Sequence, residues 1–216
     1  MNDFDSEEVK RAFYPLDDFP EFKALTDHYA VIAKELENNI FWMSWGSDSY
    51  DPKGHCKFLD GAWTVCPVYF GDYSPDLIKI PGVSAPDLEK FVLELPMHFP
   101  ETQKLLGNIS GINFAAFSRL NPRSKLARHQ HNNPLSLIFH MGLKIPAGKT
   151  CGLTVNDETH IWMKPGDAVI FDDTLLHSAW NDSDEERTIL YIDFPRQKLT
   201  PEDRMMRLLR LMGGNP

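Results

Sequence analysis

Strict alternation between residues 135 and 145 constrains the fold more than any other feature of the sequence. The apolar series is Leu135, Leu137, Phe139, Met141, Leu143 and Ile145. Successive side chains of a strand point to opposite faces, so one face of this strand is predicted to be wholly apolar. The other face carries Ser136, Ile138, His140, Gly142 and Lys144, a mixed set that suits a wet cavity better than a dry core. We therefore expect a long strand between a core and a cavity.

Short strands are predicted at close intervals on both sides of this segment. They cover residues 112–120, 151–155, 159–163, 168–171, 176–180 and 188–194. Turn residues separate them at Asn156-Asp157 and Pro165-Gly166, and the polar loop 181–186 is predicted to join the last two as a hairpin. This spacing is typical of an antiparallel sandwich or barrel.

Helical periodicity lies mostly before the strands. It predicts helices over residues 19–39, 85–95 and 101–106, with Pro96 ending the second, and a further helix that begins near residue 200. The fold class is therefore mainly β with flanking α-helices that cover one sheet from outside. We expect one domain over 1–216, divided into a mainly helical portion 1–110, a β core 111–195 and a C-terminal helix 196–216.

Charge and composition exclude several classes of partner. The 216 residues include 22 Lys and Arg against 31 Asp and Glu, a formal net charge of −9, so neither nucleic acid nor an anionic membrane surface is expected as a general partner. Apolar runs are too short to cross a bilayer, and the first residues lack the features of a signal peptide, which predicts a cytoplasmic protein. Three cysteines without C-x-x-C spacing suggest neither a disulfide framework nor a zinc knuckle.

Four histidines fall in the β region. His129 and His131 precede the long strand, His140 lies inside it, and His177 opens a later one. Two-residue spacing puts His129 and His131 on the same side of an extended chain. Imidazole is the commonest ligand for first-row metals, so histidines from distant segments of a sandwich are candidates for an iron, copper or zinc site. For each single histidine, an ordinary surface or core role is the alternative.

Arg187 follows His177 across the polar loop. The predicted hairpin would bring the two residues together. A guanidinium beside a metal-binding imidazole suits a co-substrate with a carboxylate at its far end, because the planar fork donates two parallel hydrogen bonds. The alternative is an exposed arginine paired with Glu185 or Glu186.

These residues resemble the signature of the aspartyl/asparaginyl β-hydroxylase family of iron(II)- and 2-oxoglutarate-dependent oxygenases. The segments that carry the resemblance are 170–181, Arg187, 192–193, 117–120, His129, 140–146, Trp162 with Gly166, and Cys66-Pro67. The resemblance is dense over 112–195 and thins back to about residue 60. It implies a double-stranded β-helix, the jelly-roll or cupin-like sandwich.

Carried over by position, the resemblance implies the roles of five residues. His129 and His177 would hold Fe(II). Arg187 would bind the distal carboxylate of 2-oxoglutarate with help from Ser118, and His140 would contact the co-substrate's other end. O2 is the second co-substrate, and no catalytic residue beyond the metal site is implied.

Two departures from the family pattern concern this site. The family lacks the usual third carboxylate ligand, and His131 stands where one might be found. Either water completes the site, which we favour, or His131 supplies a third nitrogen. Ile138 stands where the family tends to place an arginine that helps to bind carboxylates. Arg119, Arg123 and Arg128 are candidate replacements.

The expected activity is hydroxylation of an unactivated C–H bond in an amino acid or amino-acid-like group of the aspartyl or asparaginyl type. The expected partner is a small amino acid, or a peptide or carrier-tethered substrate, and the sequence does not decide the oligomeric state. Two alternatives remain: a metal-dependent cupin-type enzyme without 2-oxoglutarate, and a catalytically silent ligand-binding or sensor domain.

Overall fold

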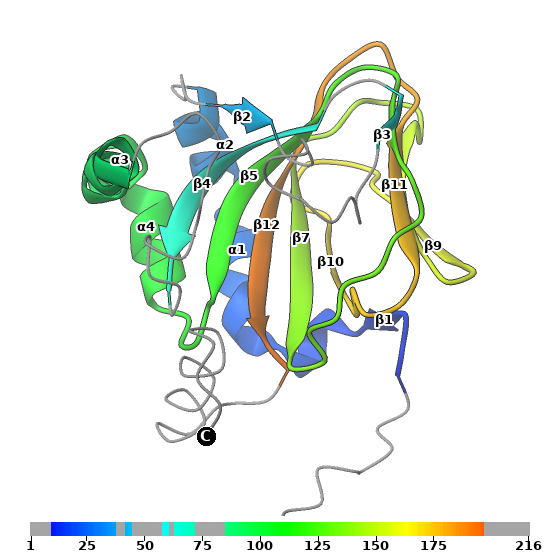
Figure 1. The fold of residues 1–216 in the computed structure, drawn as a ribbon, viewed down its shortest axis with the longest axis horizontal. Helices are drawn as coiled ribbons and strands as arrows, with labels where there is room; N and C mark the ends of the chain where they lie inside the picture. The colour runs from blue at the N-terminus through cyan, green and yellow to red at the C-terminus, as the bar shows by residue number, and fades with distance from the viewer. Residues whose placement is uncertain (1–9, 38–41, 45–57, 61–62, 72–84, 197–216) are drawn as a thin grey trace, which may run out of the picture.

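Two antiparallel sheets form the body of the protein in a computed structural model that describes residues 10–37, 42–44, 58–60, 63–71 and 85–196 (Figure 1). The seven-stranded sheet runs in the spatial order β1 (Phe13–Tyr14), β10 (Ala168–Phe171), β7 (Ser136–Lys144), β12 (Arg187–Pro195), β5 (Phe114–Leu120), β4 (Trp63–Phe70) and β2 (Met43–Ser44). The five-stranded sheet runs β3 (Phe58–Asp60), β6 (Ser124–Leu126), β11 (His177–Asn181), β8 (Cys151–Val155) and β9 (Glu158–Ile161).

The chain passes between the two sheets as it proceeds from β5 to β12. β5, β7, β10 and β12 belong to the larger sheet, whereas β6, β8, β9 and β11 belong to the smaller one. Neighbours pair antiparallel throughout, with β12 between β5 and β7 and β11 between β6 and β8. This alternation is the topology of a double-stranded β-helix, and it confirms the predicted fold class.

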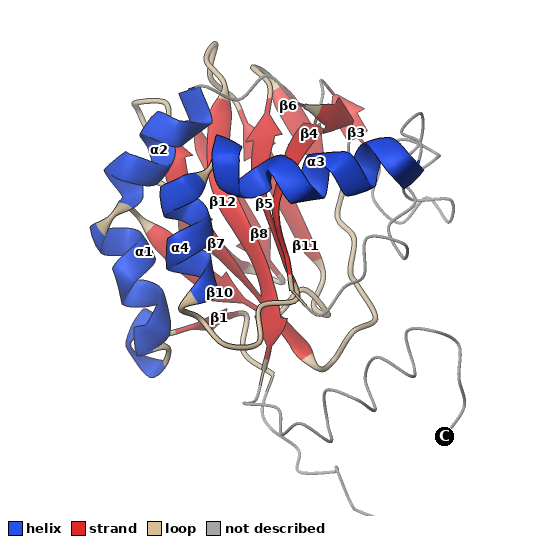
Figure 2. Ribbon diagram, turned by 90° about the vertical axis from the view of Figure 1, so that its left-hand side faces the viewer, coloured by secondary structure: helices blue, strands red, loops and turns tan. Residues whose placement is uncertain are grey.

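Helices cover the outer face of the larger sheet (Figure 2). They are η1 (Leu16–Asp18), η2 (Pro20–Phe22), α1 (Lys23–Asp27), α2 (Tyr29–Glu37), α3 (Ala85–His98) and α4 (Pro100–Gly107). Leu25, Ile32 and Leu106 from this layer pack in one core cluster with Phe139 and Leu190 from the sheet. The helices therefore cover one sheet from outside, as the sequence predicts.

The strand β7 divides the core into two parts. Leu137, Phe139, Met141 and Leu143 all belong to the cluster under the helices. Ile138 belongs instead to a second cluster, between the two sheets. The alternation in the sequence therefore marks the boundary between a helix-covered core and the interior of the sandwich.

The helices differ from their predicted bounds in two places. The segment expected to be one helix over 19–39 divides at His28, whose backbone amide bonds to the carbonyls of Ala24 and Leu25 and closes α1; residues 38–39 lie outside the described ranges. The expected stop at Pro96 is wrong, because α3 continues to His98. Leu95 and Phe99 on either side of this proline are buried in the core, and their packing outweighs the cost of about 3 kcal/mol for a proline inside a helix.

The strands differ from their prediction more than the helices do. Residues 1–110 supply β1, β2, β3 and β4, which periodicity in that portion did not predict. The predicted hairpin over 181–186 is also wrong, because β11 and β12 lie in different sheets and the loop crosses between them. The expected C-terminal helix, 196–216, lies outside the described residues except for Arg196. None of the helices in the described ranges has the length and hydropathy that a membrane span needs.

Candidate metal centre

His129, His131 and His177 form one cluster, in which His129 and His177 are buried and His131 is exposed. Each imidazole offers one ring nitrogen as a ligand atom, and these three nitrogens all lie within 4.8 Å of one another. The ring centroids of His129 and His177 are 4.2 Å apart, and that of His131 is 5.4 and 5.7 Å from them. The structure therefore brings together the two predicted ligands and the histidine whose role was left open.

Backbone pairing places these rings. His129 and His177 face each other as an isolated antiparallel bridge and exchange two backbone hydrogen bonds of 2.9 and 2.8 Å. The backbone amide of His131 donates to the carbonyl of Asp173 at 2.8 Å. Directly opposed residues of an antiparallel pair project to the same face, so the bridge fixes both imidazoles on one side.

Hydrogen bonds fix which ring nitrogen of His129 and of His177 carries the proton. Nδ1 of His129 lies 2.8 Å from the carbonyl of Ala127, and Nδ1 of His177 lies 2.9 Å from the carbonyl of Leu175. A carbonyl only accepts, so Nδ1 carries the proton and Nε2 keeps its lone pair. Metal-binding histidines are held in this way in most proteins.

The electrostatics of the cluster favour a neutral imidazole at His177. Burial, reinforced by His129, lowers the pKa of His177 to about 3. A neutral ring is the form that binds a metal ion, so no proton has to be displaced from His177 at neutral pH. The donor set and its protonation state thus fit a first-row divalent ion.

Arg187 lies in the interior of the sandwich, and no carboxylate of the described residues pairs with it. Its side chain is only 2% exposed, and its Nε is buried without a hydrogen-bond acceptor. Among the described residues it makes no ion pair, and its guanidinium lies 5.0 Å from the ring centre of Trp162. Burial lowers its pKa to about 10, which still leaves it charged at neutral pH. A buried unpaired cation is costly, so this position fits an anionic ligand.

His140 lies within electrostatic reach of both Arg187 and His177. Burial lowers its pKa well below the usual value, and the charges of Arg187 and His177 add to this effect, so both groups lie within electrostatic reach. Both of its ring nitrogens are buried and unpartnered. Its ring stacks at 6.2 Å on Trp162, the same ring that Arg187 contacts. Arg187 and His140 therefore lie against the same indole ring, and His140 is within electrostatic reach of His177.

Ser118 faces the same interior from β5. It is 4% exposed and pairs with Ile189 of β12, two residues from Arg187. Its hydroxyl accepts a hydrogen bond of 2.8 Å from Nε1 of Trp63, which leaves its own proton available to a ligand.

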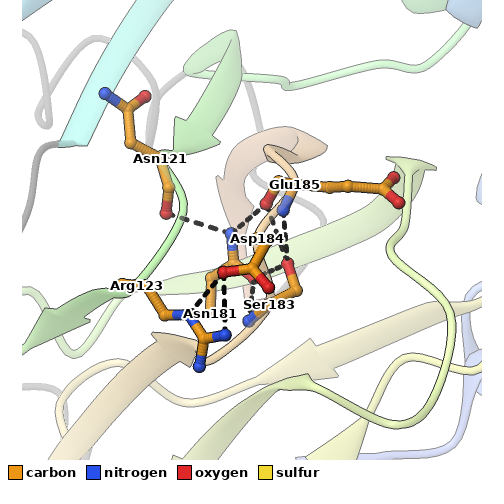
Figure 3. A network of polar contacts seen from close by, with 6 residues as sticks. All are labelled: Asn121, Arg123, Asn181, Ser183, Asp184 and Glu185. Atoms are coloured by element: carbon orange, nitrogen blue, oxygen red, sulfur yellow. Dashed lines mark hydrogen bonds and ion pairs between the residues drawn. The ribbon is translucent and has the colours of Figure 1, made fainter.

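A polar network holds the loop that delivers Arg187 to the larger sheet (Figure 3). The amide of Asn181 donates to the carbonyls of Leu120, Asn121 and Glu185 at 3.2, 3.0 and 2.7 Å, and its oxygen accepts from the amide of Ser183 at 3.2 Å. These bonds replace the hairpin that was predicted. They tie the end of β11 to the end of β5, so that β12 begins beside β5 with Arg187 facing inward.

The position of the missing arginine is apolar. Ile138 is 1% exposed and pairs with Asp193 and Phe171. None of the three candidate arginines takes its place. Arg119 contacts the ring of Trp42 and pairs with Glu186, Arg123 pairs with Asp184 at the surface, and Arg128 donates to the carbonyl of Asn156.

Two further groups at the site were not singled out from the sequence. Asp173 is 7% exposed with its Oδ1 unpartnered, and burial together with the charges of Asp193 and Asp172 raises its pKa from 3.8 to about 7. His160 has a buried, unpartnered Nε2 and packs at 4.9 Å against Trp162. The Asp-Asp pair before His177 was a visible signal for the first, whereas nothing in the local sequence indicated the second.

Comparison with known proteins identifies the family. The aspartyl/asparaginyl beta-hydroxylase family matches residues 26–197. The chain therefore belongs to that hydroxylase family, as the resemblance predicted.

Similar proteins include an ornithine lipid ester-linked acyl 2-hydroxylase from Rhizobium tropici, 33% identical over 103 residues, which covers 47% of this chain and 36% of that protein. Aspartate beta-hydroxylase domain-containing protein 2 of Xenopus tropicalis is 27% identical over 193 residues, which covers 85% of this chain and 46% of that protein. The chain thus spans less than half the length of these relatives. Among solved structures, a cupin-2 domain from Rhodospirillum rubrum aligns with a TM-score of 0.40 and 14% identity over 81% of this chain and 88% of that one.

Proposed function

We propose that the protein is an iron(II)- and 2-oxoglutarate-dependent hydroxylase. The observation that carries the proposal is a buried Arg187, unpaired among the described residues, that acts electrostatically on the same His140 as His177 of the histidine cluster. A metal ion and a dicarboxylate would together satisfy both features. Membership of a hydroxylase family supports the reaction type.

In this proposal the residues of the chain bind and orient the iron and 2-oxoglutarate. His129 and His177 hold the iron through Nε2, with the carbonyls of Ala127 and Leu175 fixing each ring. Arg187 grips the distal carboxylate of 2-oxoglutarate, the Ser118 hydroxyl donates to it, and His140 contacts the other end. Bound iron would supply the oxidising power, with O2 and 2-oxoglutarate as co-substrates.

The interior also restricts water. Trp162 is fully buried and contacts both Arg187 and His140, so the co-substrate would bind against an apolar wall. Exclusion of water strengthens the charged contacts and protects a reactive centre from competing donors.

For the substrate, we propose an amino acid or an amino-acid-like group in a peptide or on a carrier, hydroxylated at an unactivated carbon. One relative is named for hydroxylation of an acyl chain, so ornithine-lipid acyl chains are the competing class and belong in the same screen. The cytoplasmic location and the lack of nucleic-acid and membrane partners stay predictions.

Succinate release tests the proposal. Purified protein with iron(II), ascorbate, O2 and 2-oxoglutarate is expected to form succinate, faster with an amino-acid or peptide substrate. Turnover that needs a metal but not 2-oxoglutarate would favour the cupin-type alternative. Metal-independent ligand binding without succinate would favour the silent domain.

A further inference from the structure

The role of His131 is the question on which the structure says more than the sequence. His131 lies at the solvent side of the cluster, and its ring makes a small angle of 29° with that of His177. We propose that His131 is a third metal ligand, so that the site is a three-histidine centre. This inference rests on the proposed function and changes its ligand set.

The first argument is distance. Ligand atoms that share one ion at about 2.0–2.2 Å from each donor lie no more than about 4.4 Å apart, and small side-chain rotations change such a separation by several tenths of an ångström. The three imidazoles already have candidate atoms within 4.8 Å. This bound exceeds the limit by only about 0.4 Å, so small rotations of the side chains would bring all three within reach of one ion.

The second argument is backbone anchorage. His129 N to His177 O, His177 N to His129 O and His131 N to Asp173 O are three hydrogen bonds that tie segment 129–131 to segment 173–177. An extended chain puts residues two apart on the same side, so His131 follows His129 toward the ion.

The third argument is the chemistry of the alternatives. Most non-haem iron oxygenases of this kind use two histidines and a carboxylate. Within the described residues, the group that meets the distance criterion contains no carboxylate, and its third member is His131. A neutral nitrogen donor in this position suits iron(II) and cobalt(II), for which imidazole is a favoured ligand.

The test is cobalt(II) binding by the full chain, measured by calorimetry and by the visible spectrum, in the wild type and four variants. His131→Ala and His131→Gln remove the nitrogen, whereas His131→Asp offers a carboxylate in its place. His98→Ala is the matched control, because His98 is also exposed and pairs with Glu94 on α3. Far-ultraviolet circular dichroism of each apoprotein verifies the fold.

We expect His131→Ala and His131→Gln to weaken cobalt(II) binding by at least about tenfold, the lower end of what removal of an outer-shell partner costs. Their visible spectra should change, because one nitrogen leaves the ion. The cobalt(II) affinity of His131→Asp should stay within a few-fold of that of the wild type. The cobalt(II) affinity of His98→Ala should equal that of the wild type. A purely structural role for His131 would not be rescued by aspartate.

An unchanged affinity and spectrum in both His131→Ala and His131→Gln would overturn the inference, and so would an Asp variant as weak as the Ala variant. The proposed function fails differently. In that case the wild type would bind cobalt(II) through three histidines but release no succinate with iron(II) and 2-oxoglutarate.

Discussion

The two faces of β7 are built from neighbouring residues but have opposite character. Toward the helices, Leu137, Phe139 and Met141 are fully buried in a large apolar cluster. Toward the other sheet, His140 has two unpartnered nitrogens, and it shares the interior with Trp162 and the unpaired Arg187. One face therefore stabilises the fold, whereas the other holds polar groups that have no partner among the described residues.

The largest effect is expected from a change on the helix-covered face. Phe139 is fully buried and stacks on Phe22 with ring centres 4.6 Å apart. Phe139→Ala should lower the free energy of unfolding by about 3–5 kcal/mol, because it removes apolar contacts and leaves a cavity. Urea unfolding measures this. Metal affinity of the folded variant should not change, and a parallel loss of metal binding would show that the two faces are not independent.

His177→Ala should lower metal affinity with little effect on stability, the converse of Phe139→Ala. It removes a ligand from the bridge with His129, so metal affinity should fall by at least about a hundredfold, or about 2.8 kcal/mol, and turnover should be lost. The free energy of unfolding of the metal-free protein should change by less than about 1 kcal/mol, since His177 does not belong to the core cluster under the helices. Calorimetric metal titration and urea unfolding give the two numbers. Retention of metal by this variant would contradict the assignment.

Arg187→Met should separate binding from stability. The apparent requirement for 2-oxoglutarate should rise about 10- to 100-fold, because a charge-assisted pair of hydrogen bonds is lost, with little change in metal affinity. Without ligands, the variant should be more stable by about 1–4 kcal/mol, because an unpaired buried charge is replaced by an apolar group of similar length. Succinate formation against co-substrate concentration and urea unfolding test both parts. A less stable variant with unchanged co-substrate requirement would mean that Arg187 has a structural role.

The last effect concerns pH. The pKa of Asp173 is raised to about 7, so the metal-free folded state keeps a proton that the unfolded chain releases near pH 4. The stability that this proton contributes is present below pH 4 and is lost as the pH rises toward 7. The free energy of unfolding of the wild type should therefore fall relative to that of Asp173→Asn over this range, as urea unfolding at several pH values can measure. Parallel pH profiles would contradict the raised pKa.

The sequence predicted the helix-covered face of β7 better than the interior between the two sheets. Alternation in β7 predicted the strand and the helix-covered side of Leu137, Phe139, Met141 and Leu143, whereas Leu135 is exposed and Ile145 packs against the other cluster, together with Ile138. The strands β8 and β10 begin and end where expected. These features follow from local periodicity. The hairpin before Arg187 could not be judged in this way, because Asn181 bonds to carbonyls at the end of β5, about 60 residues earlier in the chain. Local polarity marks a turn but does not say which sheet the next strand joins.

Prediction of the site was limited in the same way, because local sequence features do not reveal contacts between distant segments. His129 and His177 were predicted as ligands from the resemblance, and the structure places them in one bridge. Asp173 and His160 were missed because their unpartnered atoms result from burial by distant segments. Ile138 shows that an apolar residue can fill a position expected to be charged, and none of the proposed arginines compensates for it.

The central claim is that the histidine cluster and Arg187 serve one ligand-binding space. Anaerobic titration of the iron(II)-loaded protein with 2-oxoglutarate, followed by visible absorption, tests it most directly. A saturable absorption band is expected in the wild type, at much higher 2-oxoglutarate concentration in Arg187→Met, and not at all in His177→Ala. A wild type that gives no band, or a band indifferent to Arg187, would contradict the claim.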